Sequence, residues 1–272
     1  MGIYNPFSLE GKTILVTGSS NGIGAAAVEA FAKDGYDVGI NYCNSPADAE
    51  EVAARCCAYG ADAQVYQADV SKREDCERMM NAFLEHFGRI DVLVNNAGGA
   101  LKMPKGGFVD MPLDYWDSQI ALNLSAAAYC SQAAAKNMIA NGIHGAIINI
   151  SSIHSLVTWI RRKPLPYSAG KAGLNMFTKS IGVELIKYGI NVNCIAPGLI
   201  YTKIMSRYNE RDINGFNRKI PAGFGGQTSD IVPMIQFLAD KEKSRFIVGQ
   251  TIFIDGGQSI DGAIDCMLED DY

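Results

Sequence analysis

The sequence has no long apolar run and no excess of basic residues, and these two absences exclude several classes of protein. No window approaches the roughly 18 consecutive apolar residues that a transmembrane helix needs. The formal net charge is −5, so the basic footprint of a nucleic-acid-binding protein is missing, as is any general attraction to anionic membranes. We therefore expect neither a nucleic acid nor a membrane as a partner.

Signals for export, disulfide bonding and metal binding are equally scarce. Residues 1–12 contain no cationic start followed by an apolar run, so we expect no signal peptide. The seven cysteines are odd in number and form no Cys-x-x-Cys pair, which is typical of free thiols in a reducing cytoplasm. The few histidines, with the cysteines and carboxylates, show no spacing typical of a metal site. We therefore predict a cytoplasmic protein with no bound metal.

Short apolar runs and longer helical patterns alternate along the whole chain, and this predicts the fold. Several runs are nearly continuous in Val, Ile and Leu, as in strands buried on both faces. Repeated strand–helix units form a parallel sheet with helices on both faces. The sequence therefore predicts an α/β, Rossmann-like, doubly wound sheet of about seven strands. The expected strands are 13–16, 37–42, 63–66, 91–94, 146–150, 191–195 and 251–254, and the expected helices are 23–33, 46–59, 73–87, 115–141 and 169–188.

One domain is expected over residues 1–272, because 272 residues suit one α/β domain and no linker, low-complexity tract or solenoid repeat divides the chain. Two stretches depart from the alternation. Residues 203–228 are predicted to be a substrate lid, and residues 259–272 an acidic C-terminal tail.

A glycine-rich turn follows the first expected strand and precedes the first expected helix. Glycine lets the backbone turn tightly and approach a pyrophosphate, and the N-terminus of the helix offers unpaired N–H groups. The turn therefore predicts binding of a dinucleotide. The candidate residues are Gly18, Ser20, Asn21, Gly22, Ile23 and Gly24.

The strongest chemical motif is Tyr167-Ser168-Ala169-Gly170-Lys171. Tyr167 and Lys171 are four residues apart and would share one face of a helix. A nearby ammonium group stabilises phenolate, so we expect Lys171 to lower the pKa of Tyr167 toward neutrality. The pair predicts a proton donor and acceptor.

The spacing Gly-x-x-x-Gly-x-Gly after Thr17, with Tyr-x-x-x-Lys, resembles the short-chain dehydrogenase/reductase family over residues 8–258. The resemblance implies catalytic roles for Ser152 of the pair Ser151-Ser152, for Tyr167 and for Lys171. It also implies that Asn123 holds a water that links Lys171 to solvent. Ser152 would stabilise the substrate oxygen while Tyr167 moves the proton.

The same resemblance implies further residues of a nicotinamide cofactor site. Asp69 and Val70 would border the adenine, Asn96, Ala97 and Gly98 would line the groove, and Tyr167 and Lys171 would face the nicotinamide ribose. The segment after the sixth strand would hold the nicotinamide carboxamide, through Pro197, Gly198, Ile200 and Thr202.

The choice between NAD and NADP depends on the end of the second strand, where an acid binds the 2′-hydroxyl of NAD and a cation favours the 2′-phosphate of NADP. The resemblance places Tyr42 at the usual acid position and Cys43 at the usual arginine position. Asn44 and Ser45 could donate hydrogen bonds to a phosphate, and no acid precedes Asp48. We therefore favour NADP(H) over NAD(H).

The substrate is expected to be a small molecule, because the candidate pocket walls, 99–111, 153–159 and 201–224, are rather apolar. Ser151-Ser152-Ile153-His154 with Trp159 is similar to the bacterial glucose 1-dehydrogenase branch of the family. These features favour an NAD(P)-dependent oxidoreductase of a sugar, a steroid or another small cyclic substrate. The wall candidates include Leu101, Met103, Trp159, Ile204, Met205, Tyr208 and Phe216.

Two alternative functions stay open. A 3-ketoacyl thioester reductase must dock an acidic carrier protein, which the negative net charge disfavours. A dinucleotide-sensing regulator without turnover would not need Tyr167 and Lys171. The family resemblance also implies a homo-oligomer, a tetramer or a dimer built through long helices and the last strand.

Overall fold

A computed structural model describes residues 12–100, 107–158, 165–203 and 209–260. Its centre is one seven-stranded parallel sheet with the strand order β3-β2-β1-β4-β5-β6-β7. The strands are β1 (Thr13–Val16), β2 (Asp37–Tyr42), β3 (Ala63–Gln67), β4 (Val92–Asn95), β5 (Ala146–Ile150), β6 (Asn191–Pro197) and β7 (Thr251–Ile254). The predicted doubly wound sheet is confirmed, with a reversal of strand order between β1 and β4.

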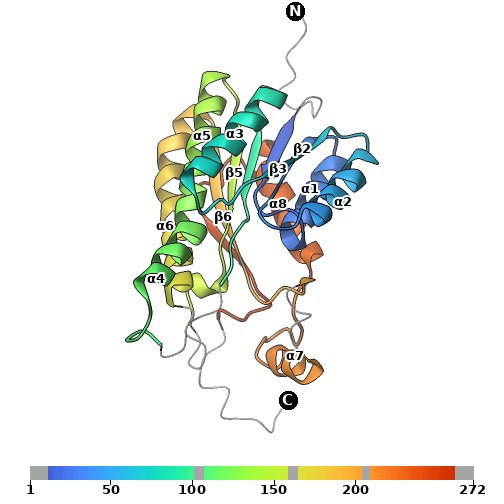
Figure 1. The fold of residues 1–272 in the computed structure, drawn as a ribbon. Helices are drawn as coiled ribbons and strands as arrows, with labels where there is room; N and C mark the ends of the chain where they lie inside the picture. The colour runs from blue at the N-terminus through green and yellow to red at the C-terminus, as the bar shows by residue number, and fades with distance from the viewer. Residues whose placement is uncertain (1–11, 101–106, 159–164, 204–208, 261–272) are drawn as a thin grey trace, which may run out of the picture.

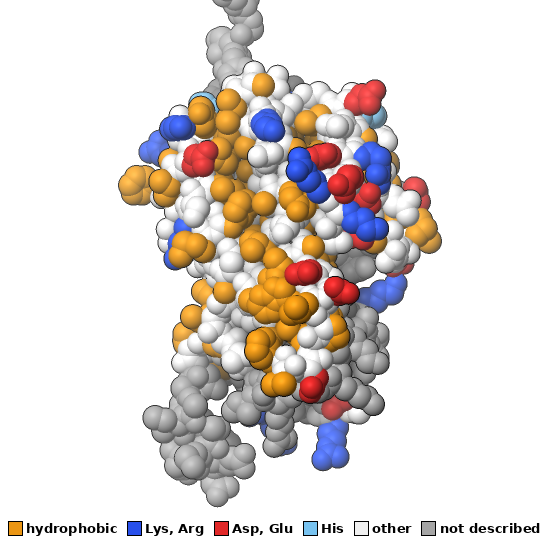
Figure 2. Space-filling model, turned by 60° about the vertical axis from the view of Figure 1, so that its left-hand side comes forward, with side chains coloured by type: hydrophobic (Ala, Val, Ile, Leu, Met, Phe, Trp, Pro, Cys, Tyr) orange, Lys and Arg blue, Asp and Glu red, His pale blue; other side chains and the backbone are white. Residues whose placement is uncertain are grey.

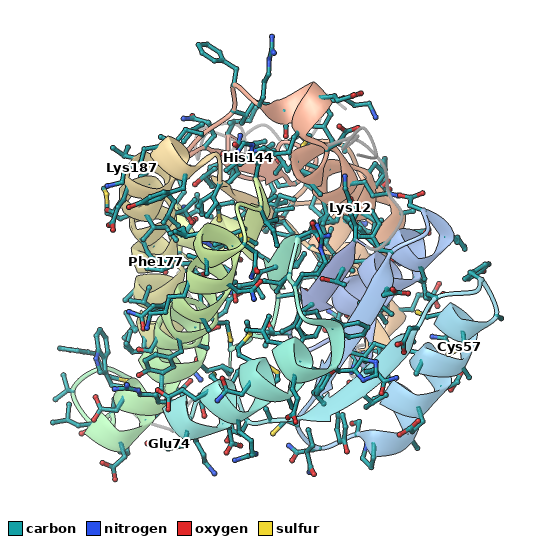
Figure 3. The ribbon with its side chains drawn as sticks, turned by 90° about the horizontal axis from the view of Figure 1, so that it is seen from above. Lys12, Cys57, Glu74, His144, Phe177 and Lys187 are labelled. Carbon is teal, nitrogen blue, oxygen red and sulfur yellow. The ribbon has the colours of Figure 1, made fainter. Side chains whose placement is uncertain are left out.

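Helices cover both faces of this sheet (Figure 1). One face packs against α1 (Gly22–Lys33), α2 (Pro46–Cys57) and α8 (Thr228–Ala239). The other packs against α3 (Arg73–Phe87), α5 (Ala126–Ala140) and α6 (Leu165–Leu185). From above, Phe177 of α6 and Cys57 of α2 lie on opposite sides of the molecule (Figure 3).

Alternation of side chains along β1 divides the core in two. Ile14 and Val16 join the cluster beneath α1, α2 and α8, whereas Leu15 joins the cluster beneath α3 and α5. Successive side chains of a strand point to opposite faces, so an uninterrupted apolar strand supplies both layers. All three residues have no exposed surface.

Two expected helices differ from the prediction in ways that affect the site. Residues 115–141 were predicted as one helix, but the structure has α4 (Leu113–Ile120), a π-helical turn (Ala121–Ser125) and then α5. Helix α6 begins at Leu165, before the predicted start at 169, so Tyr167 lies in its first turn. A proline such as Pro166 is tolerated there, because first-turn N–H groups have no partner within the helix.

The segment predicted as a lid contains a short helix, α7 (Glu210–Asn217), at the lower end of Figure 1. Ile200 and Gly226 form a parallel bridge at its base, and the Tyr201 hydroxyl donates to Asn217 Oδ1 at 2.6 Å. A short helix α9 (Lys241–Ser244) follows α8. The sequence predicted neither of these two helices. None of the helices in the described ranges is long and apolar enough to cross a membrane.

Candidate active site

The predicted site residues meet at the carboxyl ends of the central strands. The glycine turn follows β1, Asn96 follows β4, Ser152 follows β5, and Gly198 follows β6. In a parallel sheet these ends lie along one edge, and ligands bind where the strand order reverses. The fold thus brings distant parts of the sequence to one place.

Ser152, Tyr167 and Lys171 form a compact group at this edge. The Ser152 side chain lies near enough to the Tyr167 hydroxyl to lower the pKa of the phenol. Lys171 lies one helical turn further along α6, with its Nζ atom 5.9 Å from the centroid of the Tyr167 ring. This Nζ donates to the carbonyl of Ile150 at 2.7 Å, and the Lys171 side chain is buried.

The expectation that Lys171 lowers the pKa of Tyr167 is not met. Burial raises the pKa of Tyr167 above its usual 10.0, and the hydrogen bond from Ser152 lowers it in part. The lysine ammonium is directed at the Ile150 carbonyl, and burial lowers its own pKa to about 8. Both effects have one cause, because burial disfavours the charged form of each group.

Asn123 lies in the π-helical turn and is almost fully buried. Its Oδ1 accepts from the N–H of Gly99 at 3.0 Å, and its Nδ2 donates to the carbonyls of Gly99 and Gln119 at 3.2 and 3.0 Å. Asn123 therefore fixes the loop that follows β4. The water expected beside it stays a prediction.

Gly98 shows how closely these groups converge. A Cβ at this position would lie 2.9 Å from Lys171 Nζ and 3.0 Å from Asn123 Oδ1. Both distances are too short for a side chain to fit without a shift of its neighbours. The loop after β4, α6 and the π-helical turn therefore meet at this glycine.

The glycine turn fits a dinucleotide pyrophosphate. Gly18 and Gly22 have positive φ angles of 62° and 59°, a conformation that other residues rarely adopt. A Cβ on Gly24 would lie 2.7 Å from the carbonyl oxygen of Gly18, so the turn is closed tightly. Asn21 makes no side-chain cap, which leaves first-turn N–H groups of α1 without that partner.

The segment after β6 lies beside this turn. A Cβ on Gly22 would be 3.5 Å from the methyl group of Thr202. The next residue, Lys203, pairs with Asp48 in the first turn of α2 at 3.0 Å. The backbone of Gly198 donates to the carbonyl of Ile254 at 3.0 Å, which anchors the segment to β7. Pro197 ends β6, and Ile200 makes the bridge to Gly226 described above.

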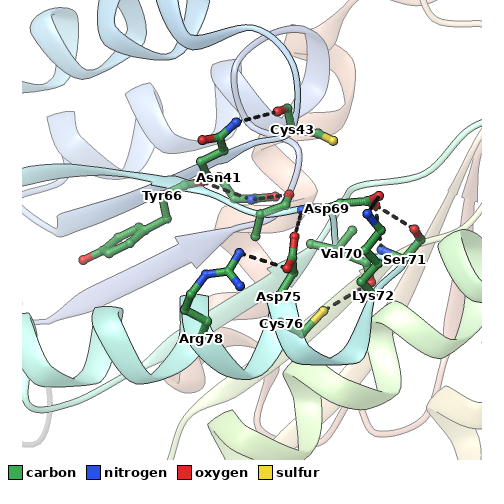
Figure 4. A network of polar contacts seen from close by, with 12 residues as sticks. Asn41, Cys43, Tyr66, Asp69, Val70, Ser71, Lys72, Asp75, Cys76 and Arg78 are labelled. Atoms are coloured by element: carbon green, nitrogen blue, oxygen red, sulfur yellow. Dashed lines mark hydrogen bonds and ion pairs between the residues drawn. The ribbon is translucent and has the colours of Figure 1, made fainter.

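Asp69 and Val70 lie at the end of β3, as predicted, but the Asp69 carboxylate already has partners (Figure 4). Its Oδ1 accepts from the N–H and the hydroxyl of Ser71 at 3.1 and 2.7 Å. The backbone N–H of Asp69 donates to the Asp75 carboxylate at 2.9 Å. These bonds fix the loop between β3 and α3.

At the end of β2, Tyr42 is half-buried and Asn44 is exposed, while Ser45 precedes α2 without a side-chain cap. Asn96 is half-buried, and its Nδ2 donates to the carbonyls of Thr17 and Gly18 at 2.9 and 3.0 Å. Ala97 donates its N–H to the Thr17 hydroxyl at 3.0 Å.

Several predicted pocket-wall residues are not placed by the structure. Leu101, Met103, Trp159, Ile204, Met205 and Tyr208 lie outside the described residues, as do residues 261–272 of the predicted tail. Phe216 is described and lies on α7.

Three polar residues that shape the site were not predicted from the sequence. Thr17 supports the loop after β4, as described above. Asn41 accepts from the N–H of Gly18 at 2.9 Å and is buried within β2. Asn175 bonds to Ser155 at 2.8 Å, and its spacing of four from Lys171 on α6 was the available signal.

In the portion of the chain that the structure describes, no group of three or more His, Cys, Asp or Glu side chains could hold a metal ion. The cysteines of that portion are all free thiols.

Comparison with known proteins identifies the family. A family model described as enoyl-(acyl carrier protein) reductase matches residues 18–259. The chain is 36% identical over 255 residues to glucose 1-dehydrogenase 2 of Bacillus subtilis, covering 93% of this chain and 96% of that protein. It is 37% identical over 250 residues to 3-oxoacyl-[acyl-carrier-protein] reductase of Synechocystis, covering 92% of this chain and 98% of that protein.

The solved structure of acetoin dehydrogenase from Enterobacter cloacae superposes with a TM-score of 0.85 at 31% identity, covering 94% of this chain and 98% of that one. The chain belongs to the short-chain dehydrogenase/reductase family and is an oxidoreductase that uses a nicotinamide cofactor, NAD(P), on the alcohol or carbonyl group of a small molecule.

Proposed function

We propose that the chain interconverts a carbonyl and a secondary alcohol on a sugar, a steroid or another small cyclic substrate, with NADP(H) as the preferred cofactor. The observation that carries this proposal is the convergence of Ser152, Tyr167 and Lys171, with Lys171 Nζ 5.9 Å from the Tyr167 ring centroid on the same helix and Ser152 near enough to lower the pKa of Tyr167. This arrangement supplies a proton and a hydroxyl group at one point of the groove.

Tyr167 is the proton donor in the direction of reduction. Its raised pKa keeps the phenol protonated at neutral pH, as a donor must be. Ser152 stabilises the substrate oxygen by a hydrogen bond while that oxygen gains charge. Lys171 resupplies the proton, with Asn123 holding the water that leads to solvent. The bound nicotinamide supplies or accepts the hydride.

The glycine turn binds the pyrophosphate through the N-terminal N–H groups of α1. Asp69 and Val70 border the adenine, and the segment after β6 holds the nicotinamide. The proposed cofactor contacts are Gly18, Ser20, Asn21, Gly22, Ile23, Gly24, Tyr42, Asn44, Ser45, Asp69, Val70, Asn96, Ala97, Gly98, Tyr167, Lys171, Pro197, Gly198, Ile200 and Thr202.

Two observations at the end of β2 support the preference for NADP(H). Asn44 is exposed and Ser45 precedes α2, so both could donate to a 2′-phosphate. The nearest acid along the chain, Asp48, is paired with Lys203 at 3.0 Å, which offsets its repulsion of a phosphate.

The similar proteins favour two different classes of substrate. Glucose 1-dehydrogenase and acetoin dehydrogenase favour a small hydroxylated substrate, whereas the Synechocystis relative favours a 3-ketoacyl thioester. The net charge of −5 weakens the second candidate, because an acidic carrier protein would be repelled. A dinucleotide-sensing regulator without turnover is the third candidate.

The test is oxidation of NADH and NADPH by the purified protein against sugars, steroids, diketones and ketoacyl thioesters, followed by cofactor absorbance. We expect turnover with NADPH and a sugar, steroid or diketone. Turnover with the thioester alone would replace the main proposal by the ketoacyl reductase. Cofactor binding without turnover on any class would favour the sensor.

We also propose a cytoplasmic homo-oligomer, a dimer or a tetramer. Figure 2, with the α5 and α6 side turned forward, shows many hydrophobic side chains at the surface. Met176 and Val183 of α6 are 60% and 75% exposed, as interface residues of an isolated subunit would be. Free cysteines support a reducing compartment. Light scattering of the purified protein measures the assembly.

The lid role of residues 203–228 is likewise proposed.

A further inference from the structure

Asn175 occupies the helical face that carries Tyr167 and Lys171, because the three residues are spaced by four along α6. Its side chain has a partner on each side. Nδ2 donates to the Ser155 hydroxyl at 2.8 Å, and Oδ1 accepts from the Cys194 thiol of β6 at 3.5 Å. Asn175 therefore links α6 to β6 and to the turn after β5.

Ser155 carries this link back to Ser152. The Ser155 hydroxyl donates to the Ser152 carbonyl at 2.7 Å, and the backbone N–H of Ser155 donates to the same carbonyl at 2.9 Å. The Ser152 hydroxyl accepts from the N–H of His154 at 3.2 Å. These bonds close the 3-10 turn Ile153–Ser155. Asn175 therefore bonds to the Ser155 hydroxyl, which in turn donates to the Ser152 carbonyl.

A second, independent tether precedes Ser152. The Ser151 hydroxyl donates to the carbonyl of Lys171 at 3.2 Å. Ser152 is therefore held to α6 on both sides, by Ser151 before it and by the Asn175–Ser155 pair after it. Tyr167 is on the same helix, so these tethers fix the distance between the Ser152 and Tyr167 hydroxyls.

We propose that Asn175 is a positioning residue, which sets the Ser152 hydroxyl against Tyr167 through Ser155. The inference rests on the proposed oxidoreductase function. Asn175 touches neither reacting group, so its loss should lower the rate of the chemical step and leave cofactor binding unchanged. Misplacement by about 1 Å can cost about 100-fold in rate, so we expect a loss of about 10- to 100-fold in kcat.

The experiment compares Asn175→Leu, Ser155→Ala and the double variant with the wild-type enzyme on its best substrate. Leucine keeps the branched shape of Asn175 and removes both hydrogen bonds. Each single variant should lose kcat, and the double variant should be no worse than either, because both changes break one link. Ser155→Thr keeps the hydroxyl and should keep the rate. Ser180→Ala, which removes an exposed side-chain bond to the Met176 carbonyl on the same helix, is the matched control.

The pH profile of alcohol oxidation separates positioning from folding. The bond from Ser152 lowers the pKa of Tyr167, so weakening it should move the profile of Asn175→Leu to higher pH. Wild-type kcat and an unmoved profile in both single variants, with turnover lost in Tyr167→Phe, would overturn the proposal. A lower kcat combined with an unmoved pH profile and a lower melting temperature would also overturn the proposal. No turnover by the wild-type enzyme would instead reject the proposed function itself.

Discussion

At the scale of single residues, the site depends on polar groups that are buried and yet bonded. Lys171 is 3% exposed, and its Nζ makes a 2.7 Å bond to the Ile150 carbonyl. A buried ammonium without such a bond would be very costly. Tyr167, by contrast, lies beside the neutral Ser152 side chain, and its phenol stays protonated to a higher pH than in water. The fold thus holds the protonated phenol of Tyr167 beside the ammonium group of Lys171.

Replacement of Tyr167 by Phe tests the proton-donor role. Phenylalanine keeps the ring and removes the hydroxyl, so we expect loss of at least about 100-fold in kcat with unchanged affinity for NADPH. Steady-state kinetics and a fluorescence titration of the cofactor measure the two quantities. Turnover close to that of the wild type would show that another group moves the proton.

The neighbouring serines offer a matched pair of variants. The Ser152 side chain lies near enough to Tyr167 to lower its pKa, whereas the Ser151 hydroxyl donates to the Lys171 carbonyl at 3.2 Å. Ser152→Ala should lower kcat about 100-fold, the usual effect of losing one donor to a developing oxyanion. Ser151→Ala removes one of the two tethers of Ser152 but no donor to the substrate oxygen, so it should lower kcat by less than about tenfold. The reverse order of effects would transfer the catalytic role to Ser151.

At the scale of elements, the sequence predicts helices and strands well and predicts their irregularities poorly. Residues 121–125 contain neither glycine nor proline, so nothing in their sequence marks the π-helical turn. Asn123 could therefore be assigned to a helix from its position, but its bonds to Gly99 could not be foreseen. Helix α8 was missed because it follows an irregular segment and contains Pro233.

The glycine turn gives a test at this scale. A Cβ on Gly24 would lie 2.6 Å from Asn96 Nδ2 and 2.7 Å from the Gly18 carbonyl oxygen. Gly24→Ala must therefore shift the backbone of the turn. We expect NADPH to bind at least about tenfold more weakly, because the displaced N–H groups no longer point at the pyrophosphate. A titration of NADPH measures the change. Lys33→Ala, at the exposed end of the same helix, is the control and should bind normally. Equal affinities would remove the glycine turn from the cofactor site.

At the scale of the whole molecule, the alternation of strands and helices was enough to predict the sheet, because crossover handedness leaves few arrangements. It could not predict contacts between distant loops. The ion pair of Lys203 with Asp48 joins residues far apart in the sequence, and neither lies in a recognisable motif. The same holds for the link from Cys194 through Asn175 to Ser155, which depends on how α6 packs against β6.

Buried thiols predict how the stability of the molecule responds to alkaline pH. Burial raises the pKa of Cys56 from 9.0 to about 12, and its side chain is fully buried. Above about pH 9 the unfolded chain loses this proton while the folded chain keeps it, so the free energy of unfolding falls as pH rises. At about pH 10.5 the contribution of Cys56 is a loss of about 2 kcal/mol.

Urea unfolding at about pH 7.5 and about pH 10.5 measures this loss, with variants that separate Cys56 from other groups. Burial also raises the pKa of Tyr36, so part of the alkaline loss is common to all variants. The fall in the free energy of unfolding should be about 2 kcal/mol smaller in Cys56→Ala than in the wild type. Cys57→Ala removes an exposed neighbouring thiol and should fall as the wild type does. Equal falls in all three proteins would show that Cys56 ionises alike in both states, and that its burial does not couple folding to pH.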